Sequence, residues 1–146
     1  MSLTMLKSTY RLRSLCRLQR IQGHKMSSQA DVLLEKVGNA GVITLNRPKV
    51  LNAFNLSMVR HIYSQLKKWE KDDETDIVII KGAGGKAFCA GGDIILVTEA
   101  GKVGDPLARD IFREEYILNN AIGTYKKPYI SLIDGITMGG VSTHIF

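Results

Sequence analysis

Two glycine clusters carry the most specific chemistry in this 146-residue sequence. The first lies in KGAGGKAFCAGGDI, residues 81–94, and the second lies in DGITMGG, residues 134–140. Each cluster follows a short apolar run that is typical of a buried strand. Glycine lets backbone amides approach a ligand closely. Two such loops could therefore aim two N–H donors at one carbonyl oxygen, which is the requirement for an oxyanion hole.

Two other interpretations of the first cluster have to be weighed. A phosphate-binding loop is excluded because Lys86 is followed by Ala87, where Ser or Thr would bind magnesium, and because the glycine spacing differs. A plain structural turn is the commoner meaning of such a loop when it is taken alone. The first cluster by itself therefore does not define an active site.

A glutamate on a predicted helix is the second candidate for chemistry. Ile111, Leu118 and Ile122 mark an apolar stripe, and Glu115 falls inside this stripe while Glu114 lies nearer its edge. A buried carboxylate must be paired, protonated or turned toward a cavity, because an unpaired buried charge is costly. The alternative is a Glu115 side chain that leans out to water.

Other reactive residue types fit structural roles better. Ser142 and His144 lack a third group that would orient the histidine, so a catalytic triad is not expected. His61 lies on the polar side of its predicted helix, and Cys89 is expected to pack as a small hydrophobic residue. Neither the histidines nor the acids have metal-ligand spacing, and we expect no metal site.

The hydrophobic pattern predicts an α/β domain. Val32 to Val37 and Gly41 to Leu45 read as a hairpin, joined by a turn at Gly38 and Asn39. An amphipathic helix begins at Leu56, with Asn55 as its N-cap.

Further along the chain the same alternation continues. The run Ile77 to Ile80 is apolar on both faces, which indicates a strand covered on both sides. A second helix covers Pro106 to Ile122, with Gly123 just past its end, and Tyr129 to Ile133 reads as another buried strand. Strands that alternate with helices favour an α/β fold.

The positive charge is confined to the front of the chain. Residues 1–30 contain six Lys or Arg and no acid, whereas the other residues contain 14 basic and 14 acidic side chains. The neutral body argues against a nucleic-acid-binding protein, and no apolar run is long enough to span a membrane. Residues 1–28 have the basic, acid-free pattern of a mitochondrial transit peptide, which predicts a protein of the matrix. A disordered basic tail is the alternative.

Three motifs together resemble the crotonase, or enoyl-CoA hydratase/isomerase, superfamily. They are LNRPKVLNAFN at 45–55, KAFCAGGDI at 86–94 and KPYISLIDGITMGG at 127–140, in the usual order and spacing. The resemblance covers residues 32–140 and implies a spiral of strand-strand-helix turns. FREEYILNN at 112–120 is similar to the 3-hydroxyisobutyryl-CoA hydrolases within this superfamily, which implies hydrolysis of a branched hydroxyacyl-CoA thioester in valine breakdown.

The resemblance also implies roles for individual residues. The amides of Gly92 and Gly140 would form the oxyanion hole for the thioester carbonyl, and Glu115 would line the acyl pocket. The segment from Lys49 through Leu51 to Ala53, together with Ala90 to Asp93, would run along the CoA moiety. Coenzyme A is then part of the substrate, no separate cofactor is expected, and copies of the chain could associate as a homo-oligomer.

The sequence departs from the family pattern at its end. Relatives continue the second glycine cluster as GGG into a long helix, whereas here Gly140 is followed by Val141 and the sequence stops at Phe146. We therefore expect residues 29–146 to form the N-terminal part of a crotonase-like domain that is incomplete at its C-terminus. Two alternatives to the hydrolase stay open, which are an inactive acyl-CoA-binding fragment and an enoyl-CoA hydratase.

Overall fold

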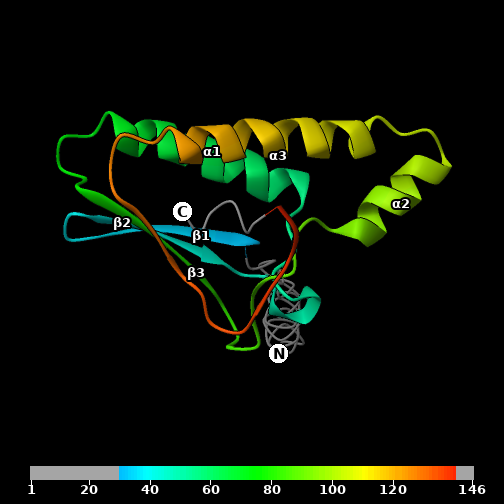
Figure 1. Ribbon diagram of the computed structural model, residues 1–146, viewed down its shortest axis with the longest axis horizontal. Helices are drawn as coiled ribbons and strands as arrows, with labels where there is room; N and C mark the ends of the chain where they lie inside the picture. Colours follow the sequence, from blue (N-terminus) through cyan, green and yellow to red (C-terminus); the bar gives the residue numbers. More distant parts are fainter. Residues whose placement is uncertain (1–29, 141–146) are drawn as a thin grey trace, which may run out of the picture.

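A computed structural model describes residues 30–140 as a sheet with helices packed on one of its faces (Figure 1). The sheet has four strands in the order β1-β2-β3-β5. Their bounds are β1 Val32–Val37, β2 Ala40–Leu45, β3 Ile77–Gly82 and β5 Tyr129–Leu132. The predicted α/β class is confirmed.

The first two strands form the predicted hairpin. β1 pairs antiparallel with β2, and Gly38 has the positive φ of 58° that the tight turn needs. β2 then pairs in parallel with β3, and β3 with β5, so that Ile43, Ile80 and Ser131 lie in one row across the sheet. Each parallel pair requires a crossover connection, and helices supply it.

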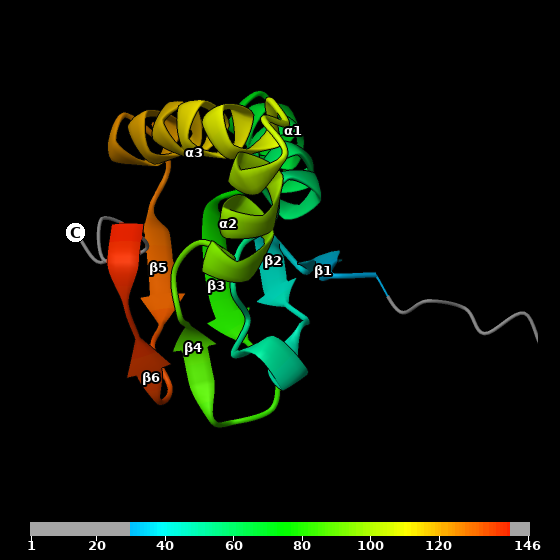
Figure 2. The ribbon, with the colours of Figure 1, turned by 90° about the vertical axis from the view of Figure 1, so that its right-hand side faces the viewer.

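Two helices lie side by side over the sheet, α1 (Leu56–Glu70) and α3 (Leu107–Gly123), as Figures 1 and 2 show. The predicted N-cap is present, because the Asn55 side chain accepts a hydrogen bond from Met58 N at 2.9 Å. Both helices bury the apolar stripes that their periodicity predicts. The buried core cluster includes Ile43, Ile62, Leu66, Val78, Ile80, Phe88, Leu118 and Ile122.

Two predicted features differ from the structure. β3 is fully covered on one face only among the described residues, because Val78 and Ile80 are buried whereas Ile77 and Ile79 on its other face are half-buried. β5 is not a buried strand, since Ile130 and Leu132 are 43% and 51% exposed at the edge of the sheet. Apolar residue type alone could not distinguish an edge strand from a central one.

The helix α3 also ends later than predicted. Gly123 is its last residue and Thr124 is the C-cap, so Gly123 does not act as a left-handed cap. Its backbone φ is not among the positive values. The predicted end of the helix, at Ile122, is therefore one residue short.

A second, smaller sheet and two short helices carry the glycine loops. β4 (Ala87–Cys89) pairs in parallel with β6 (Ile136–Thr137), and the helix α2 (Ile94–Lys102) follows the first glycine cluster. A 3-10 helix η1 covers Pro48–Val50. Sequence periodicity predicted none of these short elements. No helix within residues 30–140 is long and apolar enough to cross a membrane. The predicted transit peptide, residues 1–28, lies outside the described residues.

Candidate active site

The pairing of β4 with β6 brings the two glycine clusters into contact. The N–H of Met138 donates to the carbonyl of Cys89 at 3.0 Å. A Cβ atom on Gly91 would lie 3.0 Å from the carbonyl oxygen of Met138, and one on Gly139 would lie 3.2 Å from the Cα of Gly91. Gly91 and Gly139 also have positive φ values of 91° and 74°. Side chains at these two positions would force the loops apart, which explains why glycine is required.

A single backbone bridge sets the direction of the Gly92 amide. The N–H of Phe54 donates to the Gly91 carbonyl at 2.8 Å, and the N–H of Asp93 donates to the Phe54 carbonyl at 2.8 Å. In a parallel bridge of this kind the central residue, here Gly92, turns its own N–H and C=O away from the partner strand. The Gly92 N–H therefore points away from Phe54, and Gly92 lines the cavity described next.

The two loops, α2 and α3 line a cavity of about 360 Å³. Glu115 is the one titratable residue among the described residues that line it. Its carboxylate lies between the glycine loops, since Cβ atoms on Gly92 and Gly140 would lie 3.7 Å from Oε2 and 2.7 Å from Oε1. The remaining lining is glycine or apolar, and consists of Ile94, Val97, Ile111, Phe112 and Gly139.

The environment of Glu115 favours its protonated form. The side chain is buried on the helical stripe that predicts it, and desolvation raises the pKa of the carboxyl group. Among residues 30–140 no ion pair offsets this desolvation. Glu115 thus lines a cavity, which is one of the possibilities that the sequence left open, and its burial excludes the alternative in which the side chain leans out to water.

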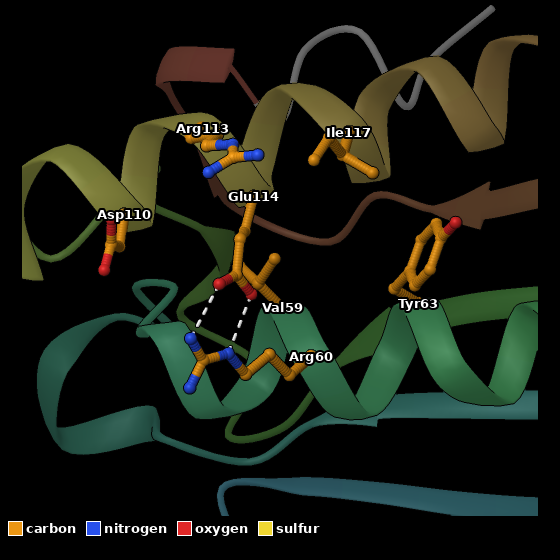
Figure 3. A pocket seen from close by; sticks show the side chains of 7 residues that line it. All are labelled: Val59, Arg60, Tyr63, Asp110, Arg113, Glu114 and Ile117. Atoms are coloured by element: carbon orange, nitrogen blue, oxygen red, sulfur yellow. Dashed lines mark hydrogen bonds and ion pairs between the residues drawn. The ribbon is translucent and has the colours of Figure 1, made fainter.

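The neighbouring glutamate points elsewhere. Glu114 accepts hydrogen bonds from Arg60 Nε at 2.8 Å and Nη2 at 2.6 Å, across the groove between α1 and α3 (Figure 3). The Arg60 guanidinium lowers the pKa of Glu114. One helix turn therefore presents two carboxyl groups with opposite pKa shifts, and only that of Glu115 faces the glycine loops.

The segment assigned to CoA by resemblance packs behind the first glycine loop. The N–H of Ala90 donates to the Leu51 carbonyl at 3.0 Å, which joins the two predicted contact segments. Ala53 is buried and Lys49 is exposed. The cavity lining includes Gly92 and Gly140 but none of these four residues.

Two polar residues that sequence reasoning missed hold this segment in place. Asn52 is fully buried with a φ of 55°, and its side chain bonds the Ala83 and Ala87 carbonyls at 2.9 Å each. Its Oδ1 also accepts the Arg47 N–H at 2.9 Å. The side chain of Arg47 in turn reaches Asp93, the residue after Gly92, at 3.0 Å. The signal in the sequence was the presence of two polar residues, Arg47 and Asn52, in the loop motif around Pro48.

The remaining candidates take structural positions. Cys89 is buried, and desolvation raises the pKa of its thiol to about 11, so the nucleophilic thiolate is disfavoured. His61 is exposed on α1. Within the described part of the chain no three His, Cys, Asp or Glu residues gather as a metal site. Ser142 and His144 lie outside it.

Comparison with known proteins assigns the chain to a family. Residues 40–144 match the enoyl-CoA hydratase/isomerase family. The chain belongs to this family, and the crotonase-type fold predicted from the sequence is confirmed.

Within this family, the chain is similar in sequence to curated relatives that share one name. The chain is 72% identical over 142 residues to a protein of Danio rerio named 3-hydroxyisobutyryl-CoA hydrolase, mitochondrial, with 96% of this chain and 37% of that protein covered. It is 63% identical over 120 residues to the Homo sapiens protein of the same name, with 80% of this chain and 31% of that protein covered. The chain thus spans about a third of the length of these relatives.

Solved structures agree on the fold. A carnitinyl-CoA dehydratase from Mycobacterium thermoresistibile is 43% identical with a TM-score of 0.75, covering 77% of this chain and 33% of that one. An enoyl-CoA hydratase from Rhodobacter sphaeroides is also 43% identical with a TM-score of 0.75, covering 80% of this chain and 36% of that one.

Proposed function

We propose that this protein acts in hydrolysis of the thioester of 3-hydroxyisobutyryl-CoA. The observation that carries the proposal is the convergence of the Gly92 amide, Gly140 and the buried carboxyl group of Glu115 on one cavity. The names of the curated relatives supply the acyl group. Because the chain matches only part of each relative, the activity of the complete proteins is carried to it as a proposal.

The backbone donors would act on charge that develops during the reaction. Attack on a thioester carbonyl places negative charge on its oxygen, and N–H groups that already point at this position stabilise it without reorganisation. Removing one such donor from an enzyme typically costs about 3 kcal/mol of barrier. In this proposal the Gly92 N–H is one donor, oriented by the Phe54 bridge, and the Gly140 N–H is the other.

Glu115 would recognise the acyl group. A cavity with one carboxyl group on an otherwise apolar wall suits a short branched acyl chain that carries one hydroxyl group. Desolvation raises the pKa of Glu115, so its carboxyl group ionises less readily than an exposed one, which reduces repulsion of the oxyanion. In this role Glu115 binds and orients the substrate.

The CoA moiety would extend from the cavity along residues 49–53 and Ala90. The Lys49 side chain is exposed beside this segment and is suited to a CoA phosphate through long-range attraction. Coenzyme A enters as part of the substrate, and the proposal needs no further cofactor. Association of copies into a homo-oligomer stays a prediction.

The proposed location is the mitochondrial matrix. The curated relatives are named mitochondrial, and residues 1–28 carry the basic pattern of an import signal. A fluorescent fusion that lacks residues 1–28 should stay outside mitochondria, whereas the complete chain should enter. Equal import of both fusions would contradict the transit-peptide assignment.

Release of free CoA tests the proposed reaction. The purified chain is mixed with 3-hydroxyisobutyryl-CoA, and the liberated thiol is measured with a chromogenic disulfide, while circular dichroism reports folding. Hydrolysis should release thiol in the native chain, and Gly92→Val should abolish the release without loss of the circular dichroism signal. Thiol release that is unchanged by Gly92→Val would contradict the oxyanion role.

Two alternative functions each have a specific observation in their favour. The solved relatives include an enoyl-CoA hydratase, and hydration of an enoyl-CoA would change the substrate absorbance without releasing thiol. An acyl-CoA-binding role without turnover is favoured by the single titratable group among the described lining residues. Saturable binding of isobutyryl-CoA by calorimetry, with neither thiol release nor hydration, would favour binding alone.

A further inference from the structure

We propose that Arg47 is a positioning residue for the Gly92 amide and acts on it through two consecutive peptide groups. This inference rests on the proposed role of Gly92 as an oxyanion donor. Nothing in the resemblance or the comparisons assigns a role to Arg47. A continuous row of hydrogen bonds and peptide groups begins at the Arg47 guanidinium and ends at the Gly92 N–H.

The first step joins Arg47 to the segment before α1. Its Nη1 donates to the carbonyl oxygen of Ala53 at 2.7 Å. That carbonyl belongs to the same planar peptide group as the N–H of Phe54. Because a trans peptide directs its C=O and N–H to opposite sides, a hydrogen bond that fixes the Ala53 carbonyl also fixes the Phe54 N–H.

The second step passes from Phe54 to the glycine loop. The Phe54 N–H donates to the Gly91 carbonyl at 2.8 Å, and this carbonyl shares its peptide group with the Gly92 N–H. The Gly92 N–H must therefore point away from Phe54, toward the cavity wall. Two rigid peptide groups in series thus connect the Arg47 side chain to the proposed donor.

A third contact keeps Arg47 at the start of this row. Asp93 Oδ2 accepts from the same Nη1 at 3.0 Å, and Arg47 and Asp93 side chains are only 17% and 10% exposed. The other oxygen of Asp93 accepts the N–H of Leu96 at 3.3 Å and caps α2. The Arg47 guanidinium is therefore fixed against both sides of the Phe54–Gly92 bridge.

The charge of Arg47 also polarises the hydrogen bonds that lead to the Gly92 N–H. Hydrogen bonds in series strengthen one another, and a charged donor at one end increases the effect along the row. The Gly92 N–H should therefore be a stronger donor to a thioester carbonyl than an isolated amide. A neutral apolar residue at position 47 would remove the hydrogen bonds of the guanidinium to Ala53 and Asp93 and would weaken this last one.

The experiment measures the stretching frequency of the thioester carbonyl in the bound ligand. The complete chain is mixed with isobutyryl-CoA that carries ¹³C at the thioester carbonyl, and isotope-edited infrared spectra give the carbonyl stretch of the bound ligand. A hydrogen bond to the oxygen lowers this frequency. The native chain should lower the carbonyl frequency relative to that of the free ligand. Arg47→Met should lose at least about half of this shift. Arg47→Lys should retain more of the shift than Arg47→Met, because the ammonium keeps the charge, although it offers a single compact donor group.

Controls separate position from folding. Arg60→Met removes a different arginine–carboxylate pair, that of Arg60 with Glu114, which lies outside the cavity, and should leave the carbonyl shift unchanged. Trp69 fluorescence and circular dichroism establish that each variant is folded. An unchanged carbonyl shift in folded Arg47→Met would overturn the inference while leaving the proposed function intact. Failure of both Arg47 variants to fold would make Arg47 a purely structural residue and would also overturn it.

A different result would identify failure of the proposed function itself. If isobutyryl-CoA binds to the native chain without any lowering of the carbonyl frequency, no donor reaches the thioester oxygen. The oxyanion role of Gly92 would then be wrong, and the positioning role of Arg47 would be wrong with it.

Discussion

The carboxylate of Glu115 lies so close to the backbone of Gly140 that a Cβ atom at position 140 would stand 2.7 Å from Oε1. Real Cβ atoms do not tolerate such a separation, so any side chain at position 140 must displace either Glu115 or the second glycine loop. The geometry of the cavity therefore depends on the absence of one methyl group.

Gly140→Ala should weaken acyl-CoA binding or turnover by about 10- to 100-fold, because a shift of about 1 Å in a site costs that much. Calorimetry with isobutyryl-CoA and thiol release measure the two effects. The matched control is Gly123→Ala, where a Cβ meets no atom within 4 Å. That change lies in α3 and should stabilise the chain by about 0.5–1 kcal/mol. Native-like binding by Gly140→Ala would show that the two residues do not limit the cavity.

Glu115→Gln should raise the free energy of unfolding at neutral pH. Desolvation raises the pKa of this carboxyl group in the folded chain, so between its unfolded and folded pKa values the folded state binds more protons. Stability therefore falls as pH rises through this window, and the amide variant removes the loss. Urea unfolding of the native chain and of Glu115→Gln at pH 4 and pH 7 measures the difference in their free energies of unfolding. A gain that is no larger at pH 7 than at pH 4 would refute the assignment.

Asn52→Ala should destabilise the chain by about 2–4 kcal/mol, because it removes the Asn52 hydrogen bonds to the Ala83 and Ala87 carbonyls and to the Arg47 N–H, all of them buried or partly buried. The backbone conformation adds a second cost, since Asn52 has a φ of 55°. Asn52→Gly loses the same hydrogen bonds but relieves this strain, and should be less destabilising than Asn52→Ala by about 1 kcal/mol. Thermal unfolding of both variants separates the two effects. Equal destabilisation would mean that the left-handed conformation carries no cost.

Cys89 should react slowly with thiol reagents in the folded chain. Burial raises the pKa of its thiol to about 11, so little thiolate exists near neutral pH. In a Cys16→Ser variant, iodoacetamide labelling at pH 8 should be at least about 10-fold slower in buffer than in urea, as expected for a buried thiol. Mass spectrometry follows the rate. Fast labelling of the folded chain would indicate an accessible, reactive cysteine.

The sequence predicted the elements whose residues repeat with a clear period. The stripe on α3 predicted the burial of Ile111, Glu115 and Leu118 correctly, and Asn55 was correctly identified as a cap. A carboxyl group on an apolar stripe is a conspicuous signal because burial of an unpaired charge is costly.

What periodicity could not predict were contacts between loops. The strands β4 and β6 contain three and two residues, which is too few for an alternating pattern. The roles of Arg47 and Asn52 depend on residues 31 to 46 positions away, such as Ala83 and Asp93. The exposure of β5 depends on what lies beside it in space, and residue type carries no information about that.

The Phe54–Gly92 bridge has a consequence for the order in which the protein acquires its shape. It joins residues 38 positions apart, and Gly140 reaches the same cavity only after β5 and β6 have been placed. Contacts so distant along the chain form late, because loop-closure entropy must be overcome before they stabilise anything. During synthesis on the ribosome the hairpin β1-β2 and helix α1 can form early. The cavity, by contrast, can close only when the last glycine loop has left the exit tunnel.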